Sequence, residues 1–158
     1  MSKYKRILVP VDFSNCSRAA LDLAALIAEA NEATIEVLHV WAQPPLKDAR
    51  VAVHHAGDVS GTLHQLGVAA EKEMAAFLEC AEHARVSVGR VESGDPTRRI
   101  LALAAEGYDL IVLGTHGRTG LSHLLLGSVA EKVSRGAPCP VVTVRLAREE
   151  PAAARKAQ

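Results

Sequence analysis

The chain has 158 residues, of which 49% are hydrophobic, and its 18 basic residues balance its 18 acidic ones. This size and hydrophobicity favour one folded domain with a substantial core and argue against disorder. The charge balance argues against a nucleic-acid partner, and we expect a cytoplasmic protein without a membrane association, because the sequence contains no spanning apolar run and no signal peptide.

The first half of the chain begins with strand and helix patterns in close succession. Residues Arg6 to Val11 form a short β-branched run that predicts a buried strand, despite Pro10 near its end. A helix is predicted from Asn15 to Ala30 with Ser14 as its N-cap, and a second strand from Ala33 to Val40. A strand followed so closely by a helix is typical of the start of a βαβ unit.

Residues 42–62 contain two prolines and few large apolar side chains, and we interpret them as a long loop or mobile insertion with room for a helical turn. The amphipathic pattern that follows predicts a helix from Leu63 to Ala84. His54, His55 and His64 belong to this region, but no carboxylate or thiol accompanies them at a fixed spacing, so no metal site is predicted. The three cysteines are also scattered, which argues against a disulfide framework: Cys16, Cys80 and Cys139.

The second half alternates more regularly. Asp95 and Pro96 form a helix start, with the aspartate as N-cap and the proline in the first turn. The predicted elements are a strand Val86 to Val91, a helix Thr97 to Glu106, a strand Asp109 to Leu113, a helix Val129 to Arg135 and a strand Val141 to Arg145. We therefore predict one α/β domain over residues 1–146, followed by a disordered tail over 147–158.

The alternation predicts an open, parallel, five-stranded sheet with helices on both faces, a Rossmann-like arrangement. Two strand orders remain natural, 3-2-1-4-5 and the flavodoxin-like 2-1-3-4-5. In the first order the winding reverses between strands 1 and 4, which end at Asp12 and Gly114. Ligands bind at such a reversal, so this order would place both residues beside one crevice. Asp12 has an alternative role as a cap of the first helix.

A glycine-rich segment follows the fourth predicted strand. Gly114, Gly117 and Gly120 recur at three-residue spacing, and Gly127 stands directly before Ser128 at a helix start. Glycine-rich turns and helix N-termini both present backbone amides to anions, which favours a phosphate site. Ser128 could cap the helix or donate its hydroxyl to an anion. The spacing matches neither the P-loop nor the dinucleotide fingerprint.

These residues resemble the universal stress protein family. The family's nucleotide pattern, Gly-x2-Gly-x9-Gly-[Ser/Thr], is matched by Gly114, Gly117, Gly127 and Ser128. The segments ILVPVDFS, GDPTRRIL, DLIVLGTHGRTGL and CPVVTVR also resemble the family, in the expected order, so the likeness covers residues 3 to 146.

The resemblance implies the 3-2-1-4-5 order and a site for ATP, whose triphosphate would carry Mg²⁺ or Mn²⁺. It implies that the adenosine lies beside Asp12 and Val40 and that the glycine-rich segment holds the ribose and phosphates. It also implies a homodimer that pairs the last strand, Val141 to Arg145. The site residues implied are Pro10, Val11, Asp12, Val40, Leu113, Gly114, Thr115, His116, Gly117, Arg118, Gly127, Ser128 and Val129.

The functional expectation is a nucleotide-regulated dimer that signals to an unknown protein partner, without catalytic residues of its own. Hydrolysis needs a placed water and usually a base, and His116 alone is available nearby. Slow ATP hydrolysis or autophosphorylation of the loop is one alternative, and a nucleotide-free interaction protein is another. An adenylate-forming or sulfur-transferring enzyme is disfavoured, because VDFSNCS after the first strand lacks the activation motifs of those enzymes.

Overall fold

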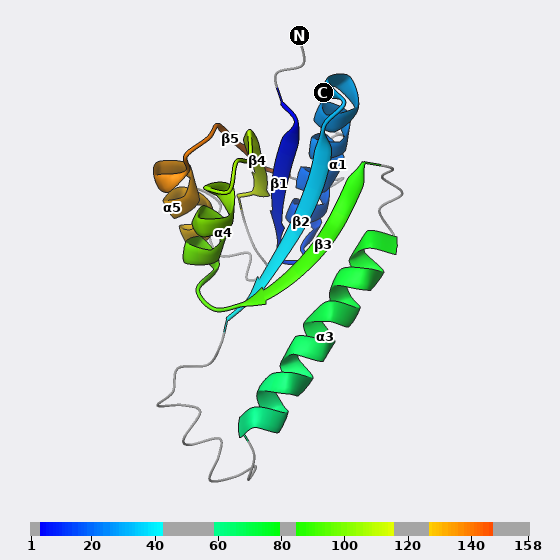
Figure 1. The fold of residues 1–158 in the computed structure, drawn as a ribbon, viewed down its shortest axis with the longest axis vertical. Coiled ribbons are helices and arrows are strands. Elements are labelled where there is room, and N and C mark those ends of the chain that lie inside the picture. Colours follow the sequence, from blue (N-terminus) through cyan, green and yellow to red (C-terminus); the bar gives the residue numbers. More distant parts are fainter. Residues whose placement is uncertain (1–3, 43–58, 80–84, 116–126, 147–158) are drawn as a thin grey trace, which may run out of the picture.

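The computed structural model describes residues 4–42, 59–79, 85–115 and 127–146, and strands and helices alternate along them (Figure 1). The elements are β1 (Arg6–Val11), α1 (Asn15–Asn31), β2 (Thr34–Trp41), α3 (Val59–Glu79), β3 (Val86–Ser93), α4 (Pro96–Ala104), β4 (Leu110–Gly114), α5 (Ser128–Gly136) and β5 (Val141–Val144).

The strands form a single parallel sheet in the order β3-β2-β1-β4-β5, which confirms the predicted fold class. β1 pairs with β2 on one side and with β4 on the other. The flavodoxin-like order is thereby excluded, since it would place β1 beside β3. The winding therefore reverses between β1 and β4, as the chosen order requires.

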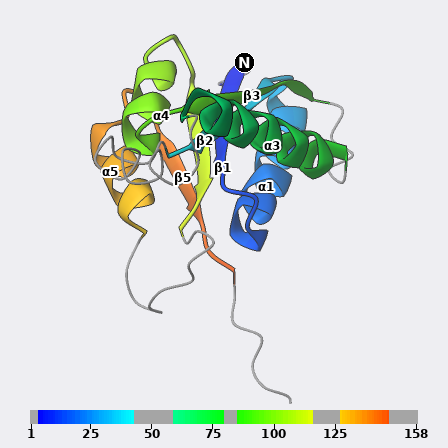
Figure 2. The same cartoon turned by 90° about the horizontal axis from the view of Figure 1, so that it is seen from below.

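The sheet separates two hydrophobic cores. Helices α1 and α3 cover one face, and α4 and α5 cover the other (Figure 2). The central strand β1 contributes to both, because Ile7 and Val9 enter the core under α1 while Leu8 enters the opposite core, each fully buried. This burial on both faces explains why the strand is a continuous apolar run.

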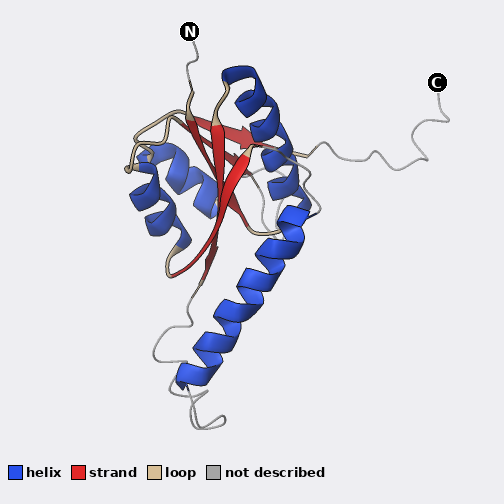
Figure 3. Cartoon of the chain, turned by 45° about the vertical axis from the view of Figure 1, so that its right-hand side comes forward, coloured by secondary structure: helices blue, strands red, loops and turns tan. Residues whose placement is uncertain are grey.

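Helix α3 differs most from its prediction. It begins at Val59, so the end of the predicted loop over 42–62 is helical. Val59, Gly61 and Thr62 are weak helix formers, and local preference alone does not predict a helix through them. Helix propagation is cooperative, which allows a strong helix to continue into such residues. Its N-terminal part extends beyond the sheet (Figures 1 and 3). Its predicted end at Ala84 lies outside the described residues. The boundaries of the other elements lie within two residues of their predictions.

Two predicted helix caps are confirmed. The Ser14 side chain accepts a hydrogen bond from the amide of Ser17 at 3.2 Å at the start of α1. The Asp95 carboxylate accepts one from the amide of Arg98 at 2.8 Å, with Pro96 in the first turn of α4. Both helices therefore begin directly after the loops that leave the carboxyl ends of β1 and β3.

Several predictions concern residues that the structure does not describe. The tail 147–158, most of the 42–62 segment including His54 and His55, and Cys80 lie outside the described residues. Cys16 and Cys139 are free thiols. Across the four described ranges, no helix combines the length and apolar character needed to cross a bilayer.

Candidate nucleotide site

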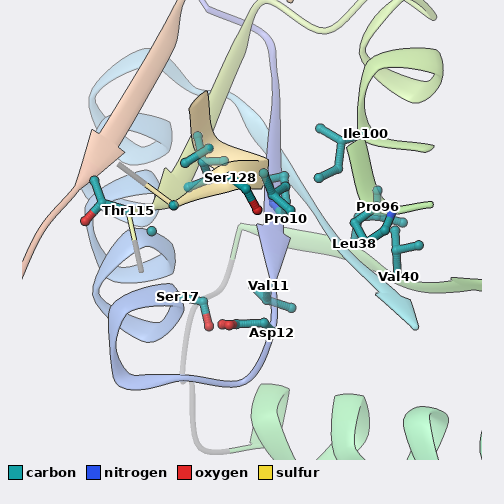
Figure 4. A pocket seen from close by; sticks show the side chains of 15 residues that line it. Pro10, Val11, Asp12, Ser17, Leu38, Val40, Pro96, Ile100, Thr115 and Ser128 are labelled. Carbon is teal, nitrogen blue, oxygen red and sulfur yellow. The ribbon is translucent and has the colours of Figure 1, made fainter. Parts of the chain in front are cut away.

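A cavity of about 330 Å³ lies where the winding of the sheet reverses, at the carboxyl ends of β1 and β4. Its walls come from β1, β2, β4, α4, α5 and the first turn of α1 (Figure 4). Ten of the sequence-predicted site residues line it together: Pro10, Val11, Asp12, Val40, Leu113, Gly114, Thr115, Gly127, Ser128 and Val129. The other three, His116, Gly117 and Arg118, lie outside the described residues.

Asp12 is held at the rim of the cavity by the turn between β1 and α1. Its Oδ1 accepts hydrogen bonds from the Ser14 amide at 3.2 Å and from the Ser14 hydroxyl at 2.6 Å. Ser14, in turn, is the N-cap of α1, so the alternative in which Asp12 itself caps this helix is wrong. Ser17 is buried and lines the cavity on the same side, where its oxygen and those of Asp12 face each other in Figure 4.

The chain leaves β4 through a closely packed position. A Cβ on Gly114 would lie 3.1 Å from the carbonyl carbon and the Sγ of Cys16, and 3.2 Å from its Cβ. Gly114 ends an extended strand and does not have a positive φ. A glycine is therefore needed here for close approach to α1 rather than for an unusual backbone conformation.

The two ends of the glycine-rich segment meet beside the cavity. The Thr115 amide donates to the Val144 carbonyl at 2.8 Å, and the Thr115 carbonyl accepts from the Gly127 amide at 2.7 Å. Thr115 is 4% exposed. Thr115 and Gly127, which flank this segment, are therefore held next to each other at the carboxyl end of β4.

Helix α5 begins at the cavity wall without a side-chain cap. Gly127 is its N-cap residue, with φ −55° and ψ 145°, and Ser128 is the first helical residue. Of the two roles left open for Ser128, helix cap or hydroxyl donor to an anion, the capping role is therefore excluded. The first bond back to the cap comes from the Glu131 amide, which donates to the Gly127 carbonyl at 2.9 Å. The amides of Ser128, Val129 and Ala130 have no partner inside the helix, as in any first turn, and these residues line the cavity. The positive end of the helix dipole thus lies at this wall.

Comparison with known proteins identifies the family. A profile of the universal stress protein family matches residues 3–145.

The chain belongs to the universal stress protein family.

Relatives of this universal stress protein agree over nearly its whole length. It is 33% identical to universal stress protein YxiE of Bacillus subtilis over 155 residues, which covers 90% of this chain and 99% of the relative. Among solved structures, protein MJ0577 of Methanocaldococcus jannaschii has a TM-score of 0.77 at 28% identity, covering 93% of this chain and 99% of that one. A universal stress protein solved in complex with cAMP has a TM-score of 0.64 at 23% identity, covering 91% and 98%, and supports the shared fold.

The structure adds five lining residues that the sequence does not predict. Leu38, Pro96 and Ile100 form apolar walls, and Ser17 and Ala130 complete the lining. Leu38 lies two positions before Val40 and therefore faces the same side of the sheet, so strand alternation could have indicated it. Pro96 and Ile100 are brought in by packing of α4 against β2, which no local pattern in the sequence reveals.

The described lining of the cavity carries a single charged side chain. Asp12 is the one acidic or basic residue among the described lining residues of this universal stress protein. The neighbouring Arg99 is turned elsewhere, since it donates to the Ser93 carbonyl at 3.1 Å and lies 3.7 Å from the Glu92 carboxylate. Within the described ranges no three His, Cys, Asp or Glu side chains are grouped in a way that would hold a metal ion. Recognition of a phosphate by these residues would therefore rely on backbone amides and hydroxyls.

Proposed function

We propose that this universal stress protein is a cytoplasmic, nucleotide-regulated signalling protein that binds ATP in the cavity between β1 and β4. The observation that carries the proposal is the convergence of an apolar pocket, a carboxylate and the uncapped N-terminus of α5 on one cavity. These three surfaces match the three parts of a nucleoside triphosphate, namely the base, the ribose hydroxyls and the phosphates.

The base would lie against the apolar walls. Leu38, Val40, Pro96 and Ile100 supply a surface without charged side chains, which suits a flat heterocycle. The Asp12 carboxylate is an acceptor that suits a ribose hydroxyl donor. A base held between β2 and α4 and a ribose beside β1 would point the phosphates toward α5.

The phosphates would meet the first turn of α5. Its amides and the Ser128 hydroxyl are hydrogen-bond donors, and the helix dipole favours negative charge at this end. In this proposal the divalent ion is carried by the triphosphate, since the described lining has a single carboxylate. His116, Gly117 and Arg118 remain predicted contacts to the phosphates.

Equilibrium binding tests the proposal with a variant that removes two hydrogen-bond donors from the first turn of α5. Ser128→Pro deletes the amide and hydroxyl of the first helical residue, where proline is well tolerated. Gly127 already has the extended conformation that a following proline requires. A lost bond to a charged phosphate should weaken ATP binding by roughly tenfold or more. Adenosine, which has no phosphate, should be affected much less.

A matched control is available at the start of α1. Asn15 is the first residue of that helix, also follows an extended N-cap residue, and is not part of the cavity lining. Asn15→Pro should therefore leave ATP binding unchanged. Equal losses in both variants would contradict a phosphate site on α5. Wild-type protein without millimolar affinity for ATP, ADP, AMP or cAMP would favour the nucleotide-free interaction protein, and multiple turnover of ATP would favour the enzyme.

We also propose that β5 pairs with the same strand of a second copy. β5 forms one edge of the sheet, with β4 as its neighbour. The carbonyls of Pro140 and Val144 accept bonds from β4 and from the residue that follows it. The backbone amide and carbonyl of successive residues point to opposite edges of a strand. Since Pro140 and Val144 point to β4, the amide and carbonyl of Thr143 point to the open edge.

Thr143→Pro removes the outward amide while the bonds to β4 remain available, so it should convert a dimer into a monomer. Thr143→Val keeps the amide and should remain dimeric. Sedimentation velocity resolves the 16.8 kDa chain from a dimer. A wild-type monomer, or a proline variant that remains dimeric, would contradict pairing through this strand.

A further inference from the structure

The residue that follows Asp12 has an unusual backbone conformation. Phe13 has a φ of +64°, and it is one of two non-glycine residues with positive φ in the described ranges, the other being Glu32 at the C-cap of α1. This left-handed conformation is unfavourable for a large L-residue and persists only where its surroundings hold it. The contacts of the Phe13 side chain should therefore identify what holds this turn.

The Phe13 ring is held between two elements on the α1 and α3 face of the sheet. Its centroid lies 4.2 Å from the His39 ring, at a tilt of 32°, and 5.5 Å from the Phe77 ring of α3, at 58°. Phe77 is 4% exposed, and the Arg18 guanidinium lies over its ring at 4.0 Å and donates to its carbonyl at 3.1 Å. The Phe13–Phe77 distance is typical of favourable aromatic pairs and the imidazole lies closer still, so the Phe13 ring is packed against both.

His39 is itself attached to the turn. Its Nδ1 lies 2.8 Å from the Val11 carbonyl, and because a carbonyl oxygen can only accept, Nδ1 must carry the proton. His39 is therefore a hydrogen-bonded residue of the sheet. The imidazole thus holds the residue before Asp12 through a hydrogen bond and the residue after Asp12 through ring packing.

We propose that Phe13 is a positioning residue of the nucleotide site, whose ring, packed between His39 and Phe77, sets the direction of the Asp12 carboxylate. The side chains of Asp12 and Phe13 lie on opposite sides of the turn. Phe13 packs against the core under α1 and α3, while Asp12 lines the cavity and accepts the two bonds from Ser14. The inference rests on the proposed function, because the ligand that Asp12 would contact is the nucleotide.

The test compares two glycine substitutions that relieve the same kind of strain. Phe13→Gly permits the left-handed backbone and removes the ring, whereas Glu32→Gly permits it at the far end of α1. Phe13→Gly should raise the Kd for ATP about tenfold, the equivalent of one misplaced ligand hydrogen bond. Glu32→Gly should bind like the wild type. ATP binding by Phe13→Gly within twofold of wild type would overturn the proposal.

Amide hydrogen exchange gives a second readout that needs no ligand. The Ser14 amide donates to Asp12 and the Ser17 amide to Ser14, so protection at both positions reports the state of the turn. Protection should fall in Phe13→Gly and stay unchanged in Glu32→Gly. If the wild type bound no ATP, the proposed function would fail, and unchanged exchange in Phe13→Gly would separately overturn the positioning role. Should Phe13→Gly fail to fold, Phe13→Leu keeps an apolar side chain and removes the ring, and it should also weaken ATP binding and lower amide protection; wild-type values for both would overturn the proposal.

Discussion

Replacement of Gly114 by alanine should destabilise the protein even though the backbone there suits any residue. The added Cβ would lie 3.1 Å from the Cys16 carbonyl carbon and Sγ, whereas carbon atoms in good contact are about 3.5–4.0 Å apart. Overpacking of this kind costs roughly 1–3 kcal/mol. Alanine also restricts the unfolded chain, which offsets about 0.4–1 kcal/mol. The net loss should be about 1–2 kcal/mol, or a Tm lower by roughly 2–8 °C.

The backbone of Cys16 is the reason that relaxation is limited. Cys16→Ala removes the sulfur contact but leaves the carbonyl carbon at the same distance, so the double variant should recover only part of the loss. Gly136→Ala is the matched control. Its new Cβ would lie 2.9 Å from Leu101 Cδ1, a closer approach, but to the end of a side chain that can rotate away.

Guanidinium unfolding monitored by circular dichroism measures both variants. Gly114→Ala should lower the free energy of unfolding by the stated amount, and Gly136→Ala by about 0.5 kcal/mol or less. A Gly114→Ala protein as stable as the wild type would refute the packing argument. So would a Gly136→Ala variant that loses more, because contact distance alone would then decide the cost.

Three further predictions follow from polar contacts. Burial and its hydrogen bond to the Glu36 carboxylate raise the pKa of Tyr108 from 10.0 to about 12. The resulting contribution of Tyr108 to the free energy of unfolding is complete below pH 10 and is lost as the pH rises toward 12. Urea unfolding from pH 9 to 12 should show wild type losing on the order of 2 kcal/mol relative to Tyr108→Phe; parallel curves would contradict this. Two backbone amides at the start of β1 lower the pKa of Asp109 from 3.8, so the contribution of its carboxylate to the free energy of unfolding is present above that pH and lost below it. Asp109→Asn should therefore be less stable at neutral pH, with a deficit that shrinks in acid; a deficit independent of pH in the same unfolding assay would exclude the carboxylate as its cause. Ser14→Ala removes the cap of α1 and should lower the free energy of thermal unfolding by about 1 kcal/mol. It should also weaken ATP binding, because Asp12 loses its hydrogen bond from the Ser14 hydroxyl. Wild-type values for both would show that another group caps the helix.

The sequence was informative where a local pattern and the fold agree. The apolar run of β1, the caps Ser14 and Asp95, and the glycine after β4 each have a short-range signature, and alternation of strands and helices limits the sheet to few orders. The winding reversal then places Asp12 and Gly114 at one edge, as the structure shows.

The failures have a different cause. The sequence left Ser128 two roles, and the N-cap of α5 is Gly127, because backbone angles rather than residue type decide where the helix begins. Pro96 and Ile100 join the cavity through the packing of α4 on β2, which is a tertiary contact. The start of α3 at Val59 depends on cooperative extension, which residue preferences do not capture.

The long helix α3 is anchored very unevenly. Residues 61–69 are all at least partly exposed, and the buried residues of the helix are Ala70, Met74 and Phe77, in the half that crosses the sheet. One continuous helix should therefore open in two stages, with its projecting turns unwinding locally and its anchored turns opening only with the rest of the domain. A protease that cut the projecting turns would shorten the helix while leaving the support beneath the β1–α1 turn in place.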